Sequence, residues 1–411
     1  MKLFSHYLLD SYRHITIGSN GYLIILLLLV CPLSQAQTPS TQVILGAERL
    51  TQYLPLLANK RVGLIVNQTS QVQDMHLLDI LLKNEVNVRV LFAPEHGVRG
   101  NAGAGEHIDS GIDALTGVAI QSIYGKDKTP PDALMQTLDV ILFDIQDVGT
   151  RFYTYISSMH YMMEAAAKHQ VDFIVLDRPN PNGMYVDGPV LEMAFQSFVG
   201  MHQIPVLHGL TVAELALMIK GEKWIENAEK LRLTVIPMQA YNKAMRYSLP
   251  IPPSPNLPND IAIELYPSLC FFEASAVSVG RGTDFPFQQI GHHQVKLGKH
   301  TFRPESRPFA APNPKLEGQT LYGIDMRNSG LKGLSLQPLI NAYRQFRLAN
   351  NEQGFFTAAD FMDKLAGTDT LRLAIQAGVP EDQIRESWQT GLQAYVRMRE
   401  PYLLYPLTPS I

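Results

Sequence analysis

The stretch "DVILFDIQDVGTRFYTYISSMHYMMEAAAKHQVDFIVLD", residues Asp139 to Asp177, joins two short apolar runs through a longer segment of different character. The runs 139–145 and 172–177 are rich in Val, Ile, Leu and Phe without polar alternation, which indicates strands covered on both faces of a sheet. Between them, residues 155–169 have apolar side chains at helical spacing. A strand, a helix and a second strand in this order predict a unit with two parallel strands.

Three earlier apolar runs follow the same plan, beginning at Arg61, Val86 and Gly117. Segments with helical spacing accompany them, at 75–85 and 131–138. Further on, Thr211 and Glu214 form a capping-box pattern at the start of another helix, and the run 231–238 follows it as a strand. Alternating strands and helices predict a doubly wound α/β domain with a mostly parallel sheet.

A proline-rich segment, residues 249–260 ("LPIPPSPNLPND"), interrupts this plan. Proline fixes φ and lacks a backbone N–H, so we expect neither a regular helix nor a central strand there. Helical patterns return at 338–348, 358–365 and 381–398. The sequence therefore predicts a larger domain over residues 37–255 and a smaller α+β domain over residues 256–411.

The N-terminus has the pattern of a secretory signal peptide. The apolar run Tyr22–Val30 follows Lys2 and Arg13, and the small residues Ser34 and Ala36 lie at the spacing of a cleavage site. The run is well short of the roughly 20 apolar residues that a spanning helix needs. We therefore expect residues 1–36 to be a signal peptide, with no stable membrane insertion after cleavage.

Cysteine content and net charge limit the cellular compartments and the classes of partner that suit this protein. Cys31 lies in the signal segment and Cys270 lies between apolar residues, so the mature chain cannot form an internal disulfide and Cys270 is expected to be buried. Export without disulfides suits a bacterial periplasm. A formal net charge of -4 gives no basic footprint for nucleic acid. The sequence thus predicts an exported, periplasmic protein without nucleic-acid partners.

Polar residues collect where the predicted parallel strands end. In an open parallel sheet, ligands bind in the crevice beyond the carboxyl ends of the strands. Asp and Asn alone are common in loops, but here carboxylates, arginines, amides and tyrosines follow several strands. The residues expected at this crevice are Asn67, Glu95, His96, Arg99, Asp144, Asp147, Arg151, Tyr153, Arg178 and Asn180.

Motifs for several other chemistries are missing from the sequence. The first strand is followed by "VNQTSQVQD" rather than by G-x-G-x-x-G, and the chain has no P-loop, H-E-x-x-H or G-x-S-x-G motif. A metal site built from His96, Asp144, Asp147 and His208 is conceivable, but the spacing of these residues is irregular. We therefore expect no metal and no cofactor, and keep a metal-dependent hydrolase as an alternative.

Glu95 is the candidate general acid. Glycosidic cleavage needs a carboxylic acid that protonates the leaving oxygen, and a crevice lined with amides, aromatic rings and arginines suits a carbohydrate. Glu95 follows an apolar strand and Pro94, which is a position of partial burial. The alternative is that Glu95 pairs with Arg99 or Arg151 and only holds the loop.

Seven stretches between Leu64 and Gly291 resemble the motifs of a known family. In chain order they are "FAPEHGVRG", "DIQDVGTRFYTYISSM", "LDRPNPNG", "DGPVLE", "FVGMHQIPVLHGLTVAELA", "PPSPNLP" and "VSVGRGTDFPFQQIG". In this order they resemble the exo-acting β-N-acetylmuramidases of the NamZ type, glycoside hydrolase family 171. The resemblance implies a Rossmann-like N-terminal domain, a smaller C-terminal domain and an active site in the cleft between them. It also implies release of N-acetylmuramic acid from the non-reducing ends of peptidoglycan fragments, with Glu95 as the catalytic acid. Where the family pattern reads E-G-T-N, this chain has Glu273-Ala274-Ser275-Ala276.

The second catalytic group stays open between Asp144, Asp147 and Tyr153. Retaining, inverting and substrate-assisted mechanisms place different demands on that group, and the sequence does not choose among them. The loops 179–183 and 280–289 are expected to wall off one end of the crevice, which would make the enzyme exo-acting. A non-catalytic periplasmic module that binds muropeptides in the same crevice is the main alternative.

Selection of muramic acid over N-acetylglucosamine calls for a cation at the site. Muramic acid differs by a lactyl ether that carries a carboxylate, and arginine can hold a carboxylate through two parallel hydrogen bonds. The candidates are Arg99, Arg151, Arg178 and Arg281. Of these, Arg281 would come from the second domain and could close over the sugar.

Overall fold

A seven-stranded sheet forms the centre of the N-terminal part of the computed structural model, which describes residues 42–100, 106 and 109–407. Its strands, in spatial order, are β5 (Gly111–Ile112), β6 (Ala119–Ser122), β4 (Val88–Ala93), β1 (Val62–Val66), β7 (Val140–Asp144), β8 (Asp172–Leu176) and β9 (Leu233–Ile236). Every neighbouring pair is parallel except β5 and β6. The strand order reverses between β1 and β7, so ligands are expected beyond the carboxyl ends of these strands.

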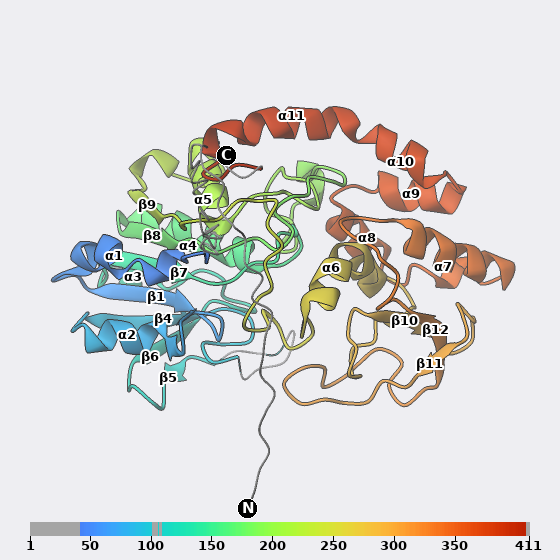
Figure 1. Ribbon diagram of the computed structural model, residues 1–411, viewed down its shortest axis with the longest axis horizontal. Helices are drawn as coiled ribbons and strands as arrows, with labels where there is room; N and C mark the ends of the chain where they lie inside the picture. The colour runs from blue at the N-terminus through green and yellow to red at the C-terminus, as the bar shows by residue number, and fades with distance from the viewer. Residues whose placement is uncertain (1–41, 101–105, 107–108, 408–411) are drawn as a thin grey trace, which may run out of the picture. The chain divides into compact units, whose positions relative to one another are not determined.

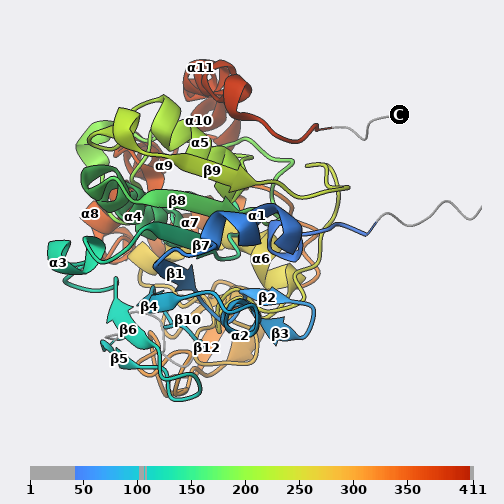
Figure 2. The same ribbon diagram turned by 90° about the vertical axis from the view of Figure 1, so that its left-hand side faces the viewer.

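Helices cover both faces of this sheet, as its near-continuous apolar strands require (Figure 2). On one face, Leu64 packs in a cluster with side chains of α1 (Leu50–Leu57) and α2 (Leu77–Lys83). On the other face, the adjacent Ile65 packs with side chains of α4 (Tyr155–His169) and α5 (Val212–Gly221). A short helix, α3 (Asp132–Met135), lies on the α4 side, and a small hairpin of β2 (Gln71–Val72) and β3 (Met75–His76) follows β1. The doubly wound, mostly parallel sheet is therefore confirmed.

The capping box predicted at Thr211 is present. Thr211 precedes α5 as its N-cap, and its hydroxyl accepts a hydrogen bond from the Glu214 backbone N–H at 3.3 Å. The Glu214 carboxylate accepts one in return from the Thr211 N–H at 2.9 Å. These bonds satisfy two donors that the first turn of a helix leaves without intrahelical partners.

The C-terminal part contains a three-stranded antiparallel sheet and several helices, which confirms an α+β composition. The sheet has the order β10 (Gln289–His292), β12 (Leu321–Asp325), β11 (His300–Phe302). The helices are α6 (Asp260–Leu269), α7 (Gln337–Leu348), α8 (Ala359–Ala366), α9 (Thr370–Ala377), α10 (Glu381–Ser387) and α11 (Gln389–Arg399). The helix predicted over 381–398 is two helices, because the chain leaves helical geometry at Trp388.

The C-terminal segment returns to the N-terminal part, with α11 running back across the top of the view in Figure 1. The Arg399 guanidinium donates to the carbonyls of His208 and Gly209 at 3.2 Å. Beyond it, the Tyr405 hydroxyl donates to Asp177 at 2.7 Å. The two parts are thus joined by the proline-rich segment and by this return, and they pack as one compact unit.

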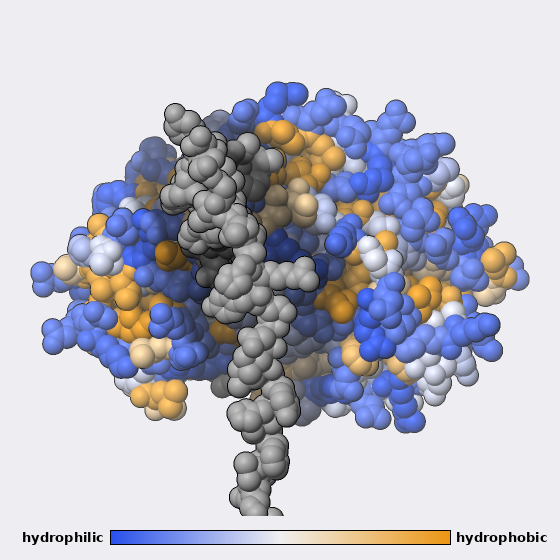
Figure 3. Space-filling view, in the orientation of Figure 1, coloured by the Kyte–Doolittle hydropathy of each residue, from blue (hydrophilic) through white to orange (hydrophobic). Residues whose placement is uncertain are grey.

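The visible surface is mostly hydrophilic, with smaller apolar patches between the polar regions (Figure 3). Among the helices that the structure describes, none has the length and apolar character needed to cross a membrane. The predicted signal peptide, residues 1–36, lies outside the described residues.

Candidate active site

A cavity of about 190 Å³ lies where the loops after β4, β6 and β7 meet the C-terminal part. The N-terminal part supplies Glu95, His96, Tyr124, Tyr153 and Thr154 to its lining. The C-terminal part supplies Tyr266 from α6, Cys270, Glu273, Arg281 and Phe287 from the segments after α6, and Phe361 and Leu365 from α8. A pocket lined by carboxylates, an arginine and aromatic rings therefore lies beyond these strand ends, where the two parts meet.

Glu95 is half-buried at this cavity, two residues after the end of β4. Its carboxylate accepts a hydrogen bond from the Thr154 hydroxyl at 3.2 Å, and the Tyr155 hydroxyl donates to its main-chain carbonyl at 3.4 Å. Burial, the charge of Glu95 and a side-chain hydrogen bond to Glu95 together raise the pKa of the Tyr124 hydroxyl. Tyr124 therefore stays protonated and can donate to the carboxylate. Two segments, the one that leads into α4 and the loop after β6, thus hold Glu95 in one position.

His96 continues the loop in an unusual backbone conformation. Its φ of 68° is in the left-handed region, which non-glycine residues seldom adopt. Its Nε2 atom lies 3.3 Å from the Ser254 hydroxyl, in the proline-rich segment. Such backbone strain is maintained only where surrounding contacts fix it, and it is frequent at functional sites. His96 therefore connects the Glu95 loop to the segment that leads into the C-terminal part.

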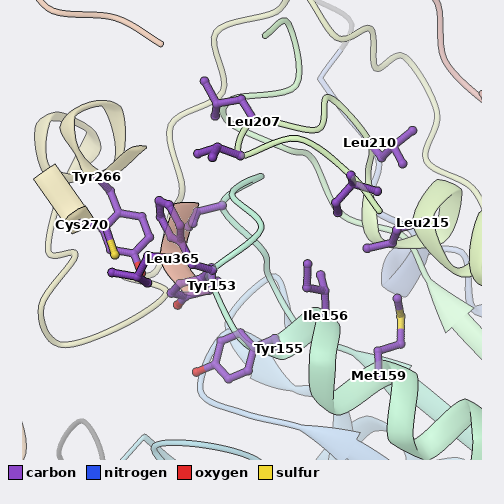
Figure 4. Packing of buried hydrophobic residues seen from close by; sticks show 14 of the residues in the cluster. Tyr153, Tyr155, Ile156, Met159, Leu207, Leu210, Leu215, Tyr266, Cys270 and Leu365 are labelled. Carbon is purple, nitrogen blue, oxygen red and sulfur yellow. The ribbon is translucent and has the colours of Figure 1, made fainter. Parts of the chain in front are cut away.

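Tyr153 forms part of the aromatic wall of the cavity. Its ring meets Tyr155 edge-on at a centroid distance of 5.1 Å and Tyr266 of α6 at 6.0 Å (Figure 4). Its hydroxyl donates to the Pro253 carbonyl at 2.8 Å. Burial is the main reason that the pKa of this hydroxyl is raised, so Tyr153 stays protonated.

The opposite wall carries an ion pair between Glu273 and Arg281. Glu273 belongs to η4 (Cys270–Ala274), and its two carboxylate oxygens accept from Nε and Nη2 of Arg281 at 2.9 and 2.8 Å. The guanidinium lies over the Phe287 ring, 4.9 Å from its centroid. Glu273 was not among the predicted site residues. The signal that could have found it is a single charge inside the apolar sequence "YPSLCFFEASAVSVG".

Several residues predicted at the site form buried contacts behind the cavity instead of lining it. Asp144 is fully buried, and both of its carboxylate oxygens accept from Arg178, one of them from Nη2 at 2.8 Å. Asp147 accepts from the Gly149 N–H at 2.6 Å, and burial raises the pKa of Asp147 to about 7. The sequence placed both at the correct sheet edge, but their carboxylates are engaged by neighbouring loops.

Arg151 is fully buried and connects the two parts. Its guanidinium donates to the carbonyls of Pro189 at 2.9 Å and Ile204 at 2.7 Å, and to that of Leu365 in α8 at 3.0 Å. Burial lowers the pKa of Arg151 to about 9, and no carboxylate charge offsets it. Glu95 therefore does not pair with Arg151, and the arginine holds backbone from both parts together.

The remaining predicted residues also have protein partners away from the cavity. Arg99 pairs with Asp113 at 3.0 Å. The Asn67 side chain accepts from the Thr69 N–H at 2.9 Å, and the Asn180 side chain donates to the Leu210 carbonyl at 2.8 Å. Among the predicted residues, the structure brings Glu95, His96, Tyr153 and Arg281 together at the cavity.

The four residues considered as metal ligands do not converge. Asp144 is occupied by Arg178, His96 contacts Ser254, and the His208 Nε2 atom lies 3.9 Å from the nearer Asp147 oxygen. Within the described part of the chain, no three His, Cys, Asp or Glu side chains are grouped to hold a metal ion. Cys270 is buried, as predicted, although its side chain also reaches the cavity wall.

A half-buried glutamic acid and a second, arginine-bound carboxylate that line one aromatic cavity suit a glycoside-cleaving hydrolase. The chain belongs to the exo-β-N-acetylmuramidase NamZ family. The family's N-terminal model matches residues 62–261 and its C-terminal model matches residues 264–405. The resemblance seen in the sequence motifs is therefore confirmed.

Individual relatives support the same assignment. The chain is 37% identical over 376 residues to the peptidoglycan β-N-acetylmuramidase NamZ of Bacillus subtilis (strain 168), covering 87% of this chain and 89% of that protein. It is also similar to crystal structures of two DUF1343 family proteins from Bacteroides fragilis NCTC 9343. One has a TM-score of 0.80 and 41% identity, covering 90% of this chain and all of the other. The second has a TM-score of 0.76 and 30% identity, covering 89% of this chain and all of the other.

Proposed function

We propose that this protein is an exo-acting β-N-acetylmuramidase that releases N-acetylmuramic acid from the non-reducing ends of peptidoglycan fragments, with Glu95 as the general acid. The observation that carries the proposal is the position of Glu95, which lines the cavity and is oriented by hydrogen bonds from other loops. A general acid must keep this kind of fixed geometry relative to the leaving oxygen. The family assignment supplies the substrate class.

The cavity also supports the proposal that single sugars are removed from chain ends. The loop 280–289 contributes Arg281 and Phe287 to the wall, so protein from the C-terminal part bounds the site. The other loop expected to close it, 179–183, contains Asn180 and Asn182, which are buried and bonded to neighbouring backbone. We infer that the loop 280–289 closes one end of the crevice, whereas the loop 179–183 supports the strand ends.

Arg281 is the arginine best placed to receive the lactyl carboxylate of muramic acid. Arg99, Arg151 and Arg178 are committed to Asp113, to backbone carbonyls and to Asp144, and do not line the cavity. Arg281 uses Nε and Nη2 toward Glu273, while 24% of its side chain remains exposed. Its remaining donors can therefore face a bound carboxylate.

The test is hydrolysis of a chromogenic N-acetylmuramic acid β-glycoside by the purified protein. We expect release of the aglycone by the wild type and loss of at least about a hundredfold in Glu95→Gln, whose amide cannot donate the proton. A protein that binds the glycoside without releasing the aglycone would be a binding module, and the proposal would fail. A role in cell-wall turnover within the periplasm follows from this substrate and from the N-terminal signal pattern.

A further inference from the structure

A glycosidase with one general acid still needs a group that completes the displacement, and the cavity contains a second carboxylate. Among the described residues that line it, the only acids are Glu95 and Glu273. Of the three groups that the sequence left open, Asp144 and Asp147 do not line the cavity, and the Tyr153 hydroxyl donates to the Pro253 carbonyl. Glu273 is therefore the carboxylate available to a bound sugar.

The surroundings of Glu273 favour its ionised form. Burial alone would raise its pKa, but the charge and hydrogen bonds of Arg281 and the charge of Lys315 outweigh burial and lower it. The Lys315 ammonium donates to the main-chain carbonyls of Phe272, at 3.1 Å, and of Glu273, at 3.2 Å. One carboxylate beside two cations stays charged at neutral pH. A base that receives a proton from water must start in this state.

The exposure and the position of the Glu273 side chain are also suitable for a catalytic carboxylate. The Glu273 side chain keeps 27% of its surface exposed despite the ion pair, so its carboxylate is open to the cavity. Glu95 lies beside Thr154 and Tyr155, whereas Glu273 lies beside Arg281 and Phe287. The same cavity is lined by the rings of Tyr153 and Tyr266, whose centroids are 6.0 Å apart, and by Phe287, whose ring centroid lies 4.9 Å from that of Tyr266.

The two carboxylates thus come from different parts of the protein and line one cavity together with aromatic rings. In inverting glycosidases the two carboxyl groups are about 6.5–9.5 Å apart, which leaves room for a water molecule beside the sugar. In retaining enzymes they are only about 5–5.5 Å apart, because one of them bonds to the sugar. Both carboxylate oxygens of Glu273 are held by Arg281, which suits a base that acts on water better than a group that must bond to the sugar.

We propose that Glu273 is the second catalytic carboxylate and acts as the general base for the attacking water. In this step the water oxygen forms a bond to the anomeric carbon, and the bond from that carbon to the leaving oxygen breaks with its electron pair. Glu95 gives its proton to the leaving oxygen, and Glu273 takes a proton from the water. The β-linked muramic acid is released as the α anomer, and the two carboxyl groups re-equilibrate with solvent. This inference rests on the proposed function.

The first experiment is the stereochemistry of the wild-type reaction. Proton NMR of the chromogenic muramic acid β-glycoside, recorded within the first turnovers, should show the α anomer before mutarotation produces the β anomer. Initial appearance of the β anomer would overturn the proposal, because a covalent or substrate-assisted route retains the configuration. If the wild type releases no aglycone at all, the proposed function has failed as well, so the two failures are distinguishable.

The second experiment uses variants of Glu273. Glu273→Gln should lower kcat at least about a hundredfold with little change in KM, and Glu273→Asp, which keeps the charge, should recover part of the loss. In Glu273→Ala, added azide should restore aglycone release and give the α-glycosyl azide, because azide needs no base. Glu317→Gln, an exposed glutamate of the same part of the chain, is the matched control and should behave like the wild type. Retention of more than a tenth of wild-type kcat by Glu273→Gln would overturn the proposal.

Discussion

Replacing Arg281 by alanine should reduce the selectivity of the enzyme for muramic acid, in addition to any effect on its rate. Arg281 enters the cavity from the C-terminal part, and two of its nitrogens are fixed by Glu273. Its third nitrogen, Nη1, carries two further N–H donors, and 24% of the Arg281 side chain remains exposed. These donors can therefore reach a carboxylate on the substrate, and N-acetylglucosamine has no such group.

The size of the effect follows from the interaction removed. A hydrogen bond to a charged group contributes about 1.5–3 kcal/mol, which corresponds to roughly a ten- to a hundredfold change. Arg281→Ala also removes the partner of Glu273, and that loss lowers turnover of every substrate. The ratio of kcat/KM for a muramic acid glycoside to kcat/KM for the matching glucosamine glycoside cancels the common loss. We expect this ratio to fall about ten- to a hundredfold.

The assay is the measurement of both kcat/KM values for the wild type, Arg281→Ala and a control. Arg307→Ala is a suitable control, because Arg307 belongs to the same part of the chain, pairs with Asp284 and keeps 43% of its side chain exposed. Its selectivity ratio should equal that of the wild type. An unchanged ratio in Arg281→Ala, with equal losses on both substrates, would show that Arg281 only supports Glu273 and does not bind the lactyl group.

Three further predictions test the remaining parts of the site. Glu95→Gln should abolish turnover but leave binding of the muramic acid product nearly unchanged in calorimetry, whereas a loss of binding equal to the loss of kcat would indicate a structural role. Arg151→Met should lower the free energy of unfolding by about 2–5 kcal/mol in urea titrations, because three buried carbonyls lose their donor, and a change below about 1 kcal/mol would contradict this. Burial raises the pKa of Asp147 from 3.8 to about 7. Between these two pH values the folded protein keeps a proton on Asp147 that the unfolded chain has released. The free energy of unfolding of the wild type should therefore fall as the pH rises from about 4 to about 7. Asp147→Asn lacks this titration, so its stability relative to the wild type should increase between about pH 4 and pH 7, and a constant difference would refute the reasoning.

Most of the N-terminal fold could be predicted because its signals are local. Continuous apolar runs and helical spacing located β1, β4, β6, β7, β8 and β9 and the helices between them. The helix α6 was missed, since it begins directly after the proline-rich segment and contains Pro267. Tertiary packing holds this segment helical: Leu265, Tyr266 and Leu269 are buried in the main core. Contacts of that kind cannot be derived from a local pattern.

The site shows the same difference between local sequence signals, which can be predicted, and tertiary contacts, which cannot. Sequence order indicates which residues follow each strand, and so it placed Glu95, His96 and Tyr153 at the correct sheet edge. It does not indicate which of them pair, because the Asp144–Arg178 pair joins residues that are 34 positions apart and the Arg151 contact to Leu365 spans 214. Glu273 was missed for a related reason, since only the meeting of the two parts brings it to the same cavity as Glu95.

The buried polar residues at the strand ends fix the positions of the loops that line the cavity. The loop after β7 carries Tyr153 and Thr154, and its position is fixed by the Asp147 bond to Gly149 and by the Arg151 bonds to both parts. Thr154 in turn donates to Glu95, and Tyr153 anchors the proline-rich segment that leads to Glu273. A displacement at Arg151 would therefore change the geometry of both carboxylates without any contact to the sugar. Since acid and base must be aligned on one anomeric carbon, activity is expected to be more sensitive than substrate affinity to changes in these buried residues.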